Sequence, residues 1–113
     1  MSQNRNKLIE LFIGNSSNVV IHKVLGKATD NLDTHSRYEK EVQNSLKKAL
    51  KYRNIINPIN EKLNEKDVNY IKNKIIRNVK SELTSRIIKG YKNVNLTLIE
   101  TFVEEFLKQS KII

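Results

Sequence analysis

Three cationic side chains follow one another at spacings of three within residues 71–90. Lys74, Arg77 and Lys80 share this stretch with seven aliphatic residues and a single acid, Glu82. Residues three apart are neighbours on a helix surface, so these cations can meet successive phosphates of a nucleic acid. Such contacts hold the phosphate backbone without reading the base sequence. The spacing therefore predicts a phosphate-binding row on one side of a helix.

A second group of lysines lies in the segment before this one, where the lysines flank Asn44. Its members fall on the polar side of a predicted helix, opposite its apolar positions. We expect the two helices to be neighbours, with Lys47 and Lys51 on the same side of the molecule as the first row. The complete candidate nucleic-acid site is Lys40, Lys47, Lys48, Lys51, Lys74, Arg77 and Lys80.

The net charge of +9 is concentrated in the middle of the chain. Residues 37–92 hold 15 Lys or Arg against six Asp or Glu, whereas the two flanking segments together are balanced. A charge excess of this kind attracts polyanions and raises encounter rates. Few aromatic residues are interleaved, and Tyr52 and Tyr70 fit the margin of a core as well as a stacking platform for bases. A lysine-rich surface that only keeps the protein soluble is the simpler interpretation, and it stays open.

Residues for other chemistry do not occur in useful combinations. The chain has no cysteine, which excludes disulfides and thiolate metal sites, and its only histidines are His22 and His35. Asp30 and Asp33 lie near His35 and could in principle hold a metal with it, but helix capping by Asp33 explains them more simply. The three scattered glycines form no loop that could cradle a phosphate. The sequence thus predicts no catalytic residue, no metal and no cofactor.

Apolar residues recur at spacings of three and four, which predicts an all-α fold. We expect a single basic helical domain over residues 1–113, with four to five helices in an orthogonal or bundle-like arrangement. Gly14 should end a first short helix, and Pro58 should interrupt the chain and keep Asn57 out of helical conformation. Only residues 94–98 alternate in the manner of a strand, and weakly. The expected helices cover residues 6–13, about 17–28, about 33–54 and about 65–89, and a last one begins near Thr97.

Residues 14–25 share some spacing with a DNA-binding helix-turn-helix unit. Gly14 stands where the turn would be, and Val20 stands where a side chain would pack back on the first helix. Three other positions depart from the pattern: Glu10, Asn15 and Lys23. An ordinary pair of helices joined at Gly14 is therefore the simpler alternative.

The apolar positions of the last two predicted helices should form the interior. We expect Ile75, Val79 and Leu83 to be buried together with Phe102 and Phe106. The apolar face of the last helix is large for its length. Packing between subunits through that helix, in a homo-oligomer, therefore stays open beside packing within one chain.

The combined observations favour a non-catalytic, small, basic helical protein. We expect it to bind nucleic acid, DNA or RNA, through the phosphate backbone, or to be an accessory subunit of a replication, transcription or RNA-processing assembly. The alternative is an interaction module or helical oligomer whose basic face meets an acidic protein. The N-terminal residues include no signal-type apolar run, and no stretch approaches the roughly 20 apolar residues of a membrane span. We therefore expect a cytoplasmic protein without a membrane partner.

Overall fold

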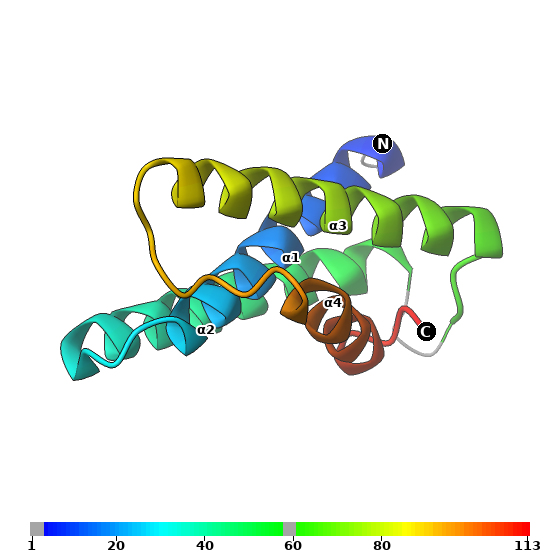
Figure 1. Cartoon of the computed structure of the whole chain (residues 1–113). Helices are drawn as coiled ribbons and strands as arrows, with labels where there is room; N and C mark the ends of the chain where they lie inside the picture. Colours follow the sequence, from blue (N-terminus) through cyan, green and yellow to red (C-terminus); the bar gives the residue numbers. More distant parts are fainter. Residues whose placement is uncertain (1–3, 58–60) are drawn as a thin grey trace.

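Four α-helices form the protein in the computed structural model, which describes residues 4–57 and 61–113 (Figure 1). The helices are α1 (Arg5–Lys27), α2 (Leu32–Ile56), α3 (Glu65–Ile88) and α4 (Leu98–Gln109). The described residues contain no strand, and residues 94–98 are not one. The prediction of an all-α fold is confirmed, and the number of helices falls in the predicted range. No helix in the described ranges is long and apolar enough to cross a membrane.

Helix α1 is the centre of the fold, because α2, α3 and α4 each pack against it (Figure 1). Twelve of its 23 residues are buried, whereas α2 buries five and α3 and α4 bury four each. A helix that is covered on several sides needs apolar residues around much of its circumference. The run from Val19 to Leu25 meets this need, since only His22 and Lys23 within it are not fully buried.

Helix α1 passes through Gly14 without a break, so the expected end of a first helix at Gly14 is wrong. The polar run after Gly14 resembles capping material in the sequence, yet its side chains bond back along the same helix. The Ser16 hydroxyl donates to the Phe12 carbonyl at 2.6 Å, and the Ser17 hydroxyl donates to the Ile13 carbonyl at 2.8 Å. Such i−4 bonds satisfy serine hydroxyls inside a helix and allow them to be buried.

The continuity of α1 also removes the helix-turn-helix hypothesis. Residues 14–25 lie within one helix and contain no turn. The alternative of two helices joined at Gly14 is wrong for the same reason. The burial of the flanking residues Phe12 and Ile13 outweighs the weak helix propensity of one glycine, which costs about 1 kcal/mol relative to alanine.

The other helix ends follow local rules that the sequence makes visible. The Asn64 side chain accepts a hydrogen bond from the Asp67 N–H at 2.8 Å and so caps α3. Gly90 follows the end of α3 in the left-handed region, with φ of 107°. Asn57 is extended, as expected for a residue before proline, and Pro58 itself lies outside the described residues.

The predicted interior is confirmed except at one position. Ile75, Val79, Leu83 and Phe106 are buried, and the Phe106 ring lies 5.8 Å from that of Phe12, centroid to centroid. Phe102 is only partly buried and packs at the edge of this core, so the prediction of its full burial is wrong. The apolar face of α4 thus packs mainly within the chain.

A buried cation, Arg53, connects the C-terminal ends of α2 and α4. The Arg53 side chain is 0% exposed, and it donates four hydrogen bonds to carbonyl oxygens. The acceptors are Asn57 at 2.9 Å, Glu61 at 3.1 Å, Ser110 at 3.1 Å and Lys111 at 3.0 Å. Arg53 thereby joins the end of α2, the following loop and the segment after α4. Desolvation lowers the pKa of Arg53, but a guanidinium stays protonated in proteins.

Gly14→Ala should stabilise the protein by about 0.5–1 kcal/mol, because alanine is the better helix former. A Cβ added at Gly14 meets no atom within 4 Å, so no clash opposes this gain. Urea denaturation measures the change. A loss of stability would show that Gly14 occupies a left-handed turn, as in the two-helix alternative.

Phe106→Ala should lower the free energy of unfolding by about 3–5 kcal/mol, since it leaves a cavity at the centre of the core. Phe102→Ala removes the same atoms from a partly exposed site, so we expect less than about half of that cost. The two variants are compared by thermal and urea denaturation. Equal costs would contradict the placement of Phe102 at the edge.

Arg53→Met should cost about 3–4 kcal/mol, because it leaves four carbonyl oxygens without their charged donor. Arg53→Lys keeps the charge, but a single ammonium cannot reach acceptors in three segments. The stability of the Lys variant should therefore lie between that of the wild type and that of the Met variant. Chemical denaturation of the three proteins gives the order. A Met variant as stable as the wild type would contradict the connecting role of Arg53.

Candidate nucleic-acid interface

The three candidate cations of α3 lie away from its buried stripe. That stripe consists of Ile71, Ile75, Val79 and Leu83. Arg77 and Lys80 are exposed, and Lys74 is partly buried on the shoulder of the helix. At 1.5 Å of rise per residue, Lys74 and Lys80 are separated by about 9 Å along the axis. The row is therefore accessible over nearly two turns.

The four candidate lysines of α2 are all exposed. Lys40, Lys47 and Lys51 lie nearly opposite Ala49, which is fully buried against α1. Lys48 lies closer to the side of the helix. These lysines form a second row, on the exposed side of α2.

The two rows do not lie on neighbouring helices, and that expectation is wrong. Helices α2 and α3 pack against α1 and make no direct contact with each other. The apolar stripes gave no hint of this order, because a stripe identifies the buried side of a helix but not its partner. The structure brings Lys74, Arg77 and Lys80 together, and it separates them from Lys40, Lys47, Lys48 and Lys51.

Several other cations of the middle segment are engaged inside the molecule. Arg53 is buried, Lys72 lies 3.3 Å from Glu104, and Arg86 lies 2.7 Å from Glu82. The hydrogen bond to Glu82 raises the pKa of Arg86. None of the seven candidate cations forms an ion pair within residues 4–57 and 61–113. The structure thus separates cations with internal partners from the two exposed rows.

Helices α1 and α3 run in the same direction, and contacts join them along their length. These contacts are Arg5–Asp67 at 2.8 Å, Glu10–Tyr70, and Ser17–Asn78 at 3.4 Å. Tyr70 is exposed and donates its hydroxyl to Glu10, which raises the pKa of Tyr70. Tyr52 packs partly buried against the core. Tyr52 thus lies at the margin of the core, whereas Tyr70 lies exposed on α3, one turn before Lys74.

A polar groove of about 560 Å³ lies between α1 and α3. Gly14, Ser17 and Asn18 line it from α1, and Asn78 and Ser81 line it from α3. Sequence reasoning missed this groove because it interpreted the Gly-Asn-Ser-Ser run as a turn. The available signal was the recurrence of small and polar residues at helical spacing.

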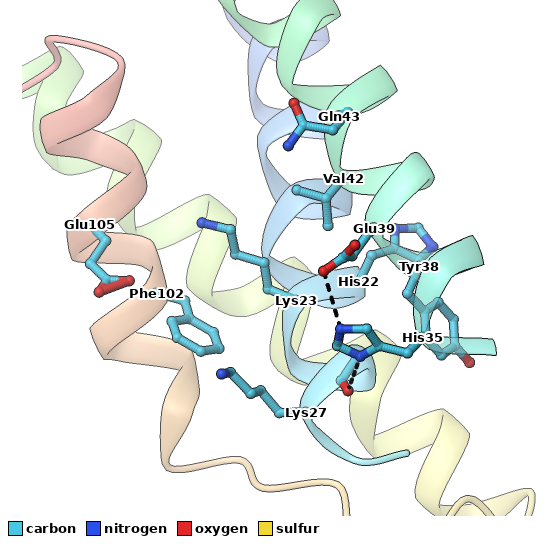
Figure 2. A pocket seen from close by; sticks show the side chains of 11 residues that line it. His22, Lys23, Lys27, His35, Tyr38, Glu39, Val42, Gln43, Phe102 and Glu105 are labelled. Atoms are coloured by element: carbon cyan, nitrogen blue, oxygen red, sulfur yellow. Dashed lines mark hydrogen bonds and ion pairs between the residues drawn. The ribbon is translucent and has the colours of Figure 1, made fainter. Parts of the chain in front are cut away.

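A second hollow, also of about 560 Å³, lies between α1, α2 and α4 (Figure 2). Lys23 and Lys27 point across it toward α4, while Glu39 and Glu105 supply an equal number of carboxylates. Its formal charges balance, so this hollow offers a phosphate less attraction than the exposed rows.

Both histidines border this second hollow. His35 is partly buried, with Nδ1 at 3.0 Å from the Gly26 carbonyl oxygen and Nε2 at 3.1 Å from the Glu39 carboxylate (Figure 2). His22 contacts the Asn18 carbonyl at 2.8 Å. Within the described ranges, no three His, Cys, Asp or Glu residues are grouped so that they could hold a metal ion.

The class of the protein is thus a small all-α domain with two exposed cationic rows and a polar groove. Comparison with protein-family models, with curated proteins and with solved structures gives no match.

Proposed function

We propose that this protein binds nucleic acid through the phosphate backbone and performs no catalysis. The observation that carries the proposal is the α3 row of Lys74, Arg77 and Lys80, which is accessible and has no internal ion-pair partner in the described ranges. Cations that are free to meet phosphates release condensed counterions on binding, and this release is the main source of affinity that is independent of sequence.

The dimensions of the α3 row suit a single phosphate backbone. One strand of a duplex carries a phosphate about every 3.4 Å along the axis, so the roughly 9 Å between Lys74 and Lys80 corresponds to two or three phosphates. Asn73 is exposed and lies four residues before Arg77, so it is a neighbour of Arg77 on the helix surface and can add a neutral donor to a phosphate oxygen. The α2 row would then hold a second, separate segment of nucleic acid or an acidic partner.

This activity suits a cytoplasmic accessory subunit of a replication, transcription or RNA-processing assembly. A protein that grips the backbone without reading bases can keep a strand in place while another subunit supplies specificity or chemistry. Helix α4 carries Glu100, Glu104 and Glu105 and would turn away from the phosphates.

An interaction module for an acidic protein is the second candidate function. Its support is the exposed apolar end of the α3 segment, where Ile87 is 38%, Ile88 is 80% and Tyr91 is 42% exposed. Lys80 and Ile87 are seven residues apart and so share one side of the helix. An acidic peptide with an apolar anchor would fit such a strip.

Removing the α3 row should weaken binding and its salt dependence together. For the triple variant Lys74→Ala, Arg77→Ala, Lys80→Ala, the plot of log affinity against log salt should flatten by about 2–3 units, because each lost phosphate contact contributes about 0.7–0.9. Stability should change by less than about 0.5 kcal/mol for each exposed position. Fluorescence anisotropy with DNA and RNA oligonucleotides across a salt series measures the slope, and circular dichroism checks the fold.

The matched control removes the same charge elsewhere, through Lys27→Ala, Lys62→Ala and Lys108→Ala at three exposed positions. It should change the slope by less than about 1 unit, since these lysines lie outside both rows. Equal slopes for the two triple variants would refute the α3 site. Absence of wild-type binding at low salt would favour the acidic-protein alternative instead.

A further inference from the structure

The packing of the protein does not explain why position 14 is a glycine. Its backbone is helical, where glycine is unfavourable, and a Cβ at this position would meet no atom within 4 Å. Gly14 lines the groove between α1 and α3, so a side chain much larger than a methyl at this position would fill part of that space. The space is therefore available to a molecule from outside.

The groove presents mostly uncharged hydrogen-bonding groups. The hydroxyl of Ser81 and the amides of Asn18 and Asn78 offer both donors and acceptors, whereas the Ser17 hydroxyl already donates to the Ile13 carbonyl and keeps only acceptor capacity. Only the Asn78 amide to Ser17 hydroxyl contact, at 3.4 Å, joins two of these side chains. Such groups match the edges of nucleobases and the hydroxyls of sugars, which also present donors beside acceptors.

Two cations of the α3 row lie one helical turn away from residues that line the groove. Lys74 lies four residues before Asn78, and Arg77 lies four residues before Ser81, so each cation is next to a groove residue on the helix surface. Lys80 lies on the other side of Arg77 and faces away from the groove. Phosphates held by Lys74 and Arg77 would bring an attached nucleoside to the groove.

We propose that the groove between α1 and α3 receives one nucleoside of a single-stranded nucleic acid whose phosphates bind Lys74 and Arg77. This inference rests on the proposed function. The volume of about 560 Å³ lies within the range of pockets that hold small ligands, about 300–1,000 Å³. At the far end of the groove, Arg86 holds the Glu82 carboxylate, which can accept a hydrogen bond from a base amino group or a sugar hydroxyl.

A single strand fits this site better than a duplex does. Bases of a duplex are stacked and paired, and turning one out costs a few kcal/mol, whereas bases of a single strand are already accessible. A duplex can therefore meet the α3 row but leaves the groove empty. The groove thus adds a preference for single strands to a row that by itself has none.

Filling the groove should remove this preference and leave backbone binding intact. Gly14→Leu places an aliphatic side chain in the groove from α1, and Ser81→Leu does so from α3. The matched controls are Gly14→Ala, which adds only a Cβ, and Thr84→Leu, which is exposed on α3 outside the groove. The probes are 12-nucleotide DNA and RNA strands of mixed sequence and their duplexes, measured by anisotropy at one salt concentration.

The wild type should bind at least one of the single strands about tenfold more tightly than its duplex. Gly14→Leu and Ser81→Leu should each abolish that ratio without changing duplex affinity by more than about twofold, and both controls should retain it. Equal binding of strand and duplex by the wild type, or equal weakening of both by the Leu variants, would overturn the groove site and leave the α3 row standing. Absence of binding to every probe would overturn both proposals. Agreement of two substitutions from opposite walls keeps the result independent of a folding defect in either.

Discussion

The burial of helix α1 is the constraint on which the rest of the structure depends. A helix covered by three others must satisfy its polar side chains within itself, and Ser16 and Ser17 do so through bonds to the preceding turn. The same position of α1 keeps α2 and α3 apart. The exposed cations consequently form two rows on helices that do not contact each other, although the sequence concentrates them in one continuous segment.

Arg53 provides a second structural constraint, at the ends of α2 and α4. The segment that follows α4 is short, and Arg53 fixes it to the end of α2 by hydrogen bonds to Ser110 and Lys111, next to the buried Ile112. The carbonyl ends of helices carry partial negative charge, so a guanidinium near the C-termini of α2 and α4 is favourable without a carboxylate partner. A cation that adds to the formal charge of the chain thus has a structural role and is inaccessible to polyanions.

The sequence predicted the elements better than their arrangement. Caps and stops such as Asn64 and Gly90 depend on local backbone geometry, and the stripe of α3 depends on helical period, so both could be read without the fold. Gly14 was misread because tertiary burial on both sides outweighs the propensity of one residue. The depth of Phe102, the burial of Arg53 and the separation of α2 from α3 depend on which faces meet, and no local pattern encodes that choice.

The candidate site shows the same division. Each cationic row could be predicted, since it needs only helical spacing and an apolar stripe on the other side of its helix. The groove could not, because its walls come from two helices far apart in the sequence. Gly14 belongs to both descriptions. Within α1 it is a poor helix former, and between α1 and α3 it lines the groove. Its cost of about 1 kcal/mol to α1 has no counterpart in the packing of the chain, since no atom occupies the space beside it. A local rule broken without a compensating internal contact is typical of a functional position, which is consistent with the nucleoside site that we propose in the groove.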